Sequence, residues 1–196
     1  MRSGAVVGCT IAALSAAICG TALAATPAGE AVIVDAKGDV PGALDVAAVR
    51  FGLGEDQRLR AIVTMAAPWE SKALLAGDDR VPGSVCLRLY TKADPAAAAP
   101  DYLVCATVAA DGASMRGEVL RERGHTLPKL IGKATVTRPT QRSITIRFAR
   151  SAIGSPKSLR FGVEATKPGC SSATCVDSVP DAPKTARYPA VRDAKD

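Results

Sequence analysis

Three aspartates near the amino-terminal part of the chain have the residue type and spacing of a metal site. Asp35, Asp39 and Asp45 lie close together in the sequence, and Gly38 stands between the first two. Carboxylate oxygens are the hard ligands that calcium prefers, so these side chains are candidate calcium ligands. Aspartate and glycine also make ordinary turns. The pattern therefore predicts either a calcium site or an acidic turn that holds no metal.

Groups that catalyse reactions are sparse in this chain. Its one histidine, His125, lies in a polar stretch, and no Gly-x-Ser-x-Gly motif provides a nucleophilic serine. Glu118 and Glu122 fall on one face of an expected strand about 13 Å apart, farther than the two carboxylates of a glycosidase. We therefore predict no catalytic residue, and a hydrolase is only a remote alternative.

The first 24 residues have the layout of a cleaved secretory signal peptide. A basic start at Arg2 is followed by an apolar run that ends at Ala22-Leu23-Ala24. We predict cleavage after Ala24 and a single domain over residues 25–196, secreted or held at the cell envelope or in the periplasm. No later segment is long and apolar enough to span a membrane.

Four cysteines follow the signal segment, and they can form two disulfide bonds. They are Cys86, Cys105, Cys170 and Cys175. An even number of cysteines in an exported chain is typical of disulfides, although the sequence permits three pairings. We predict the pairs Cys86–Cys105 and Cys170–Cys175, because each of them closes a local loop. A zinc site is not expected, since Cys86 and Cys105 lack the spacing of zinc ligands.

The charge of the chain is unevenly distributed. The formal net charge is +6, and eleven basic residues but only two acidic ones fall between Arg116 and Arg160. Such an asymmetry can attract an anionic partner, or it can be a solvated face without a partner. A nucleic-acid partner is not expected, because the chain carries an export signal and no nucleic-acid motif.

The clearest structural element is a β-hairpin over residues 85–108. If Cys86 faces Cys105 in antiparallel pairing, the apolar residues of both strands share one face. The cross-strand pairs on that face are then Leu87 with Val104 and Leu89 with Tyr102. A disulfide and a hydrophobic pattern that require the same register support each other.

Other short runs of alternating apolar residues recur along the chain, and turn-forming residues separate them. We expect further strands over residues 31–34, 44–51, 59–65, 115–123, 134–137, 143–149, 159–165 and 186–191. No long helical period interrupts this series. The sequence therefore predicts an all-β fold, an antiparallel β-sandwich with a jelly-roll or immunoglobulin-like layout and two local disulfides.

Three short stretches carry a resemblance to a known group of proteins. One is the acidic turn at residues 35–39 with Leu44-Asp45-Val46 after it, and another is residues 148–154 before Leu159-Arg160-Phe161. The third is Asp181-Ala182-Pro183. These stretches resemble the opening turn, a late strand with its return strand, and the closing motif of secreted DOMON-like β-sandwich modules, which include the family 9 carbohydrate-binding modules. The resemblance implies sugar binding in some members, haem binding in others, and calcium near the opening acidic turn of the sugar binders.

Sugar-binding sites stack sugar rings on exposed aromatic faces. Periodicity places several of the few aromatic residues in the core, which leaves Trp69 and Tyr90 as candidate ligand-binding residues. Arg88 joins them, because it lies beside Tyr90 on the hairpin. Trp69 can equally fill an edge of the core, and Tyr90 can simply cover its own hairpin.

Haem is not expected, because its axial ligands would have to come from Met65, Met115 or His125. Met65 has an inward-facing pattern, and His125 lies in a polar loop. Taken together, the residues predict an exported, non-catalytic binding module at the cell envelope, with a neutral or anionic polysaccharide as its partner and calcium as its one candidate cofactor. The alternative is a structural or protein-interaction domain without a small ligand.

Overall fold

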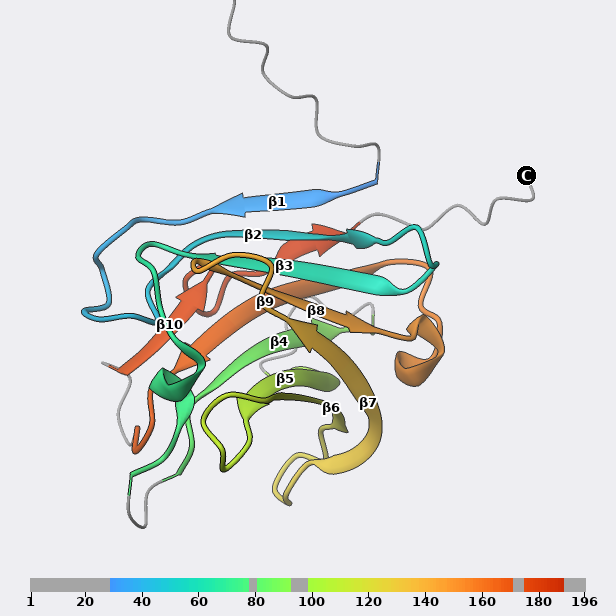
Figure 1. Cartoon of the computed structure of the whole chain (residues 1–196). Helices are drawn as coiled ribbons and strands as arrows, with labels where there is room; N and C mark the ends of the chain where they lie inside the picture. Colours follow the sequence, from blue (N-terminus) through green and yellow to red (C-terminus); the bar gives the residue numbers. More distant parts are fainter. Residues whose placement is uncertain (1–28, 78–80, 93–98, 171–174, 189–196) are drawn as a thin grey trace, which may run out of the picture.

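The computed structural model describes residues 29–77, 81–92, 99–170 and 175–188. These residues form an all-β domain with antiparallel strands and no α-helix (Figure 1). The strands are β1 (Ala31–Val34), β2 (Val46–Leu53), β3 (Leu59–Met65), β4 (Ser84–Tyr90), β5 (Tyr102–Val108), β6 (Met115–Arg121), β7 (Lys129–Thr137), β8 (Ser143–Phe148), β9 (Leu159–Thr166), β10 (Val176–Val179) and β11 (Ala186–Tyr188). Two single-turn 3-10 helices, η1 (Ser71–Leu74) and η2 (Arg150–Ile153), lie in connections. The predicted signal peptide lies outside the described residues.

The strands belong to one continuous sheet that nearly closes into a barrel. Their order is β1-β2-β3-β8-β7-β6-β5-β4-β9-β10, and β11 also pairs with β9. Strand β7 connects the two halves of the sheet, since residues 129–134 pair with β6 and residues 135–137 pair with β8. Figure 1 shows β7 curving strongly between these two partners. The all-β, antiparallel prediction is confirmed, and the two expected layers are the two halves of this one curved sheet.

The hydrophobic core lies inside the curved sheet. Period-two alternation sends one side of each strand inward, as in β3, where Leu59, Ala61, Val63 and Met65 are all almost completely buried. The ring of Phe51 on β2 stacks on Phe161 of β9 at 4.6 Å and meets the edge of Tyr188 on β11 at 5.2 Å. Aromatic packing therefore joins the early strands to the late ones.

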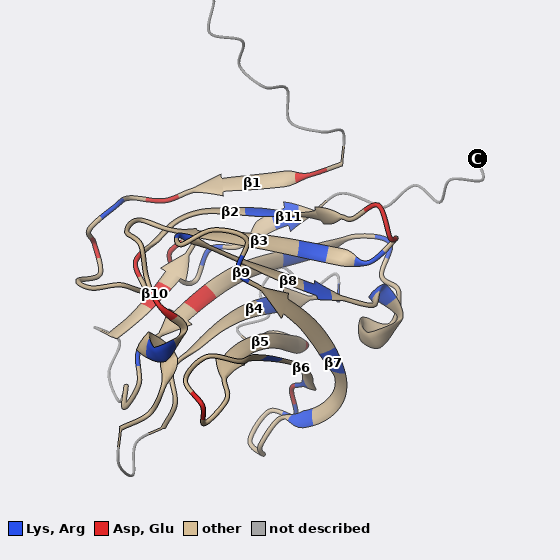
Figure 2. Ribbon diagram, viewed as in Figure 1, with Lys and Arg blue, Asp and Glu red and all other residues tan. Residues whose placement is uncertain are grey.

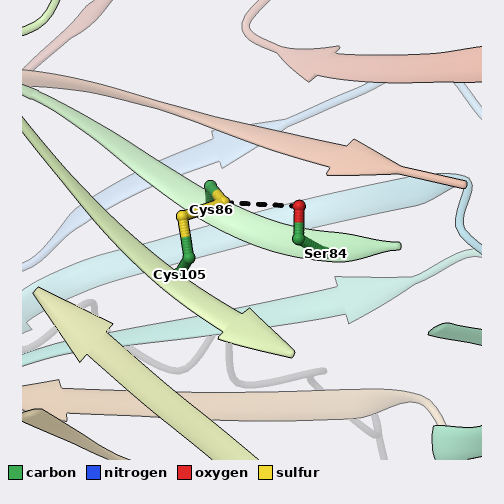
Figure 3. The surroundings of a disulfide bond; sticks show 3 residues. All are labelled: Ser84, Cys86 and Cys105. Carbon is green, nitrogen blue, oxygen red and sulfur yellow. Dashed lines mark hydrogen bonds between the residues drawn. A yellow bond between two sulfur atoms is a disulfide. The ribbon is translucent and has the colours of Figure 1, made fainter. Parts of the chain in front are cut away.

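The predicted hairpin is formed by β4 and β5 in the expected register. Cys86 lies opposite Cys105, and the flanking pairs are Leu87 with Val104 and Leu89 with Tyr102. Both predicted disulfides are confirmed, and we call Cys86–Cys105 the hairpin disulfide and Cys170–Cys175 the short-loop disulfide. In Figure 3 the hairpin disulfide crosses between the two strands, next to Ser84. Disulfides of this kind indicate an oxidising compartment outside the cytosol.

Two elements differ from the sequence prediction. Strand β7 begins at Lys129, five residues before the expected start, and exposed Lys129, Leu130 and Lys133 hide its apolar alternation. Strand β10 was not expected at all, because the buried Asp177 occupies an inward-facing position where the pattern requires an apolar residue. None of the helices in the described ranges has the length and apolar character needed to cross a membrane.

Candidate functional site

The first and last parts of the chain meet at the open seam of the sheet. The backbone N–H of Val46, at the start of β2, donates to Oδ2 of Asp177 on β10 at 2.5 Å. This contact brings the turn after β1 next to β10 and the residues that follow β10. Five carboxylates gather there, and we call them the acidic cluster: Asp35, Asp39, Asp45, Asp177 and Asp181. Figure 2 shows acidic segments around the turn after β1 and around β10.

The acidic cluster has the spacing of a metal site. One oxygen each from Asp39, Asp45 and Asp177 lie within 4.8 Å of one another. The same holds for Asp35, Asp39 and Asp181, so Asp39 belongs to both groups. Because calcium binds oxygens at about 2.3–2.6 Å, two ligands of one ion lie up to about 5 Å apart. Either group of three can therefore contact a single ion.

Two members of the acidic cluster are deeply buried. Asp45 is 6% exposed and Asp177 is 2% exposed. Asp45 accepts a hydrogen bond from the N–H of Gly38 at 2.7 Å through Oδ2, whereas its buried Oδ1 has no partner. Oδ2 of Asp35 is buried and unpartnered as well. A buried carboxylate oxygen without a donor is costly, and a bound cation would remove that cost.

The electrostatics of the cluster also favour a cation. Burial raises the pKa of Asp177 to about 6, the Val46 N–H opposes this shift, and the neighbouring carboxylates add to it. Burial and the charges of Asp39, Asp181 and Asp45 raise the pKa of Asp35, against the hydrogen bond from the N–H of Ala36. The nearby ammonium of Lys167 donates to the backbone carbonyl of Pro41. The carboxylates thus repel one another in a partly dry site.

Sequence reasoning found three of the five carboxylates. Asp35, Asp39 and Asp45 are brought together as predicted for candidate calcium ligands. It missed Asp177 and Asp181 as ligands, because they lie far along the chain and reach the site only when β10 docks beside β2. The available signal was Asp177 itself, a carboxylate in a short run that begins and ends with valine, Val176-Asp177-Ser178-Val179.

Trp69 and Tyr90 do not form an exposed aromatic surface. They are only 4% and 5% exposed, so neither ring offers an open face for stacking. Trp69 lies under the guanidinium of Arg138, which is 4.3 Å from the ring centre and donates to the Trp69 carbonyl. Tyr90 lies in a different place, at the carboxyl end of β4, where it lines a pocket that does not include Trp69.

Arg88 lies on the outer face of β4, with Tyr90 two residues further along the same face. Its Nη1 forms an ion pair with Oε1 of Glu164 on β9 at 2.9 Å, and its side chain is 11% exposed. Arg88 therefore pairs with a residue of the neighbouring strand β9.

Comparisons with protein families, with curated proteins and with solved structures find no match to this chain. The resemblance to DOMON-like modules stays a prediction, and the geometry of the site is what bears on function.

Proposed function

We propose that this chain is an exported, non-catalytic binding module of the cell envelope, and that its acidic cluster binds calcium. The observation that carries the calcium proposal is the burial of Asp45 and Asp177 together, with Oδ1 of Asp45 lacking any hydrogen-bond partner. The proposal of export depends on the signal-like residues 1–24, and the two disulfides agree with it.

The donor set favours calcium over other metals. All candidate ligands are carboxylate oxygens, which suit calcium, magnesium and manganese rather than zinc or copper. The oxygens come from a turn, a strand and a loop in separate parts of the chain. Calcium accepts irregular coordination by six to eight oxygens, whereas magnesium requires near-ideal octahedral geometry.

Calcium at this position would join the two ends of the sheet. Its ligands would come from the turn after β1, the residue before β2, and β10 with the loop after it. An ion that binds only the folded arrangement stabilises it by mass action. The role we infer for calcium is therefore to hold the seam closed and to fix the surface around it.

Calcium titration calorimetry tests this proposal. Protein purified after export is freed of metal with a chelator, and calcium and magnesium are then titrated in separate experiments. We expect saturable calcium binding that Asp45→Asn and Asp177→Asn each abolish or weaken strongly. Asp56→Asn, which alters an exposed turn carboxylate outside the cluster, serves as the matched control. Absence of calcium binding, or equal binding by the Asp45→Asn variant, would contradict the proposal.

A second candidate function is a structural or protein-interaction domain without a small ligand. The burial of Trp69 and Tyr90 favours it, because a polysaccharide cannot stack on covered rings. Co-sedimentation with neutral and acidic cell-wall polysaccharides distinguishes the two functions. Binding to either class supports the polysaccharide-binding module, and its absence at every salt and calcium concentration supports the interaction domain. A jelly-roll or immunoglobulin-like arrangement of the strands stays a prediction.

A further inference from the structure

The connection between β6 and β7 carries the most exposed large apolar side chain in the described part of the chain. This residue, Leu127, is 88% exposed, and Leu130, the second residue of β7, is 53% exposed. Arg121 lies directly opposite Lys129, so one short loop joins the two strands beyond that pair. We call residues 121–130 the β6–β7 tip. Figure 1 shows this part of the chain, in yellow, at the opposite end of the molecule from β1.

The apolar surface of the tip continues across the outer face of the sheet. Leu130 lies directly opposite Leu120 on β6, and Leu120 lies directly opposite Leu103 on β5. Residues that lie opposite each other point to the same face of a sheet. That face is the outer one, because Val104, the next residue after Leu103, is completely buried in the core. Leu103 and Leu120 are only half-buried, so the leucines form an apolar stripe that leads to the tip.

Basic side chains accompany this stripe. Five of them belong to β6, β7 and their connection, and they are Arg116, Arg121, Arg123, Lys129 and Lys133. The same segment contains only two carboxylates, Glu118 and Glu122. Within the described ranges, no ion pair involves any of these seven side chains. The guanidinium of Arg121 lies 5.6 Å from the ring centre of Tyr102, a contact that leaves its charge in place. The segment therefore presents an excess of positive charge to the solvent.

A pocket of about 290 Å³ lies beside Leu130. It is lined by Arg116, Gly117, Glu118, Leu130, Lys133 and Ala134. Two cations and one carboxylate give the lining a positive balance, and Leu130 adds an apolar wall. Such a lining suits a phosphate group that is attached to an apolar chain.

We propose that the β6–β7 tip docks on a bilayer that contains anionic phospholipids. Leu127 and Leu130 would enter the boundary between headgroups and acyl chains, while lysine and arginine side chains reach the phosphates with their charged ends. A negatively charged membrane surface attracts basic segments of this kind.

Two features of the tip select this partner over others. The positive charge favours an anionic bilayer over a neutral one. The exposed leucines favour a bilayer over a soluble acidic polysaccharide, because a hydrated sugar chain offers no apolar interior to an aliphatic side chain. The inference rests on the proposed location at the cell envelope, but it depends on neither calcium nor polysaccharide binding.

Co-sedimentation with lipid vesicles tests the proposal. One set of vesicles consists of phosphatidylcholine, and the other of phosphatidylcholine and phosphatidylglycerol in equal parts. With a chelator present, we expect the protein to sediment with the mixed vesicles and not with phosphatidylcholine alone, and high salt should weaken the binding. No binding to the mixed vesicles, or equal binding to both sets, would overturn the proposal.

Variants locate the contact. Leu127→Ala should weaken binding to the mixed vesicles about tenfold, since it removes most of the apolar side chain that enters the bilayer. Arg123→Gln should weaken it about fivefold. Val34→Ala, at a 78% exposed position on β1, and Arg50→Gln, at an exposed position on β2, are the matched controls and should leave the affinity unchanged. Equal losses in the controls would show diffuse adsorption and would overturn the proposal.

Tryptophan fluorescence distinguishes insertion from adsorption. In Leu127→Trp the new side chain stands at the tip, whereas Trp69, the single tryptophan of the chain, is 4% exposed and should not respond to vesicles. We expect the mixed vesicles to shift the emission of the variant to shorter wavelength. Unchanged emission in protein that sediments with the vesicles would contradict insertion of the tip.

The membrane proposal and the calcium proposal fail independently. Vesicle binding in chelator, by a protein that binds no calcium, would support the tip and contradict the calcium site. Calcium binding without vesicle binding would do the reverse. Binding of soluble polygalacturonate that Leu127→Ala and Arg123→Gln weaken, without any binding to vesicles, would assign the tip to a polysaccharide and overturn the membrane proposal.

Discussion

Asp177→Asn should make the metal-free protein more stable at neutral pH. In the folded protein, burial and neighbouring carboxylates raise the pKa of Asp177 from 3.8 to about 6. The folded state therefore holds the proton more tightly than the unfolded state, so the stability it contributes is complete below pH 4 and is lost as the pH rises through 6. A shift of roughly two pKa units corresponds to about 3 kcal/mol, which is the largest loss this one group can cause.

The asparagine side chain removes this loss. It carries no charge, and its oxygen can still accept the hydrogen bond from the N–H of Val46. In the presence of a chelator near pH 7, the variant should unfold at a temperature roughly 6–12 °C above that of the wild type, since a domain of this size gains about 2–4 °C per kcal/mol. Near pH 4 the two proteins should unfold at about the same temperature.

Calcium should reverse the order of stability. The wild type gains about 4.1 kcal/mol when free calcium is a thousandfold above its dissociation constant, which exceeds its deficit of about 3 kcal/mol, whereas Asp177→Asn lacks one ligand and should gain much less. Thermal unfolding followed by circular dichroism at both pH values, with calcium or chelator, measures all of these differences. The reasoning is refuted if the metal-free variant is no more stable than the wild type near pH 7, or if Asp56→Asn shows the same gain.

Four further variants test other parts of the fold. Replacing both cysteines of the hairpin disulfide by alanine should cost about 3 kcal/mol, against about 2 kcal/mol for the short-loop disulfide, and equal shifts in melting temperature would contradict this ranking. Arg138→Ala should cost about 1–2 kcal/mol and shift the emission of Trp69, the single tryptophan, to longer wavelength; unchanged emission would show that Arg138 does not cover the ring. Glu164→Gln leaves Arg88 without its charged partner and should cost about 1–3 kcal/mol in urea unfolding, because the Glu164 side chain is 31% exposed; a loss below about 0.5 kcal/mol would contradict the role of this ion pair.

Local patterns predicted the strands that are specified by residues only a few positions apart in the sequence. The β4–β5 hairpin is the clearest case, because the cysteine pair and the alternation of Leu87 and Leu89 require one register. Strand β8 followed in the same way from Ile144 and Ile146, which alternate with polar residues. These features depend on neighbouring residues, so the sequence is sufficient to predict them.

The features that sequence reasoning missed depend on distant parts of the chain. Asp177 becomes a member of the acidic cluster only because β10 lies beside Val46, which is 131 residues earlier. The burial of Trp69 depends on Arg138, which stacks on its ring from a separate loop. Contacts between strands that are distant in the sequence decide these features, and no local pattern encodes such contacts.

The seam between β2 and β10 also has a consequence for the order of folding. Strands β4, β5 and β6 are consecutive in the chain and pair with each other, so they can assemble before the later strands are available. The turn over residues 35–45, although made early, obtains its partners only when β10 has been added. If the chain crosses a membrane from its amino-terminal end, this turn lacks its carboxylate partners until the last strands have crossed as well. Seam closure is then among the last steps of folding, and it takes place on the far side of that membrane.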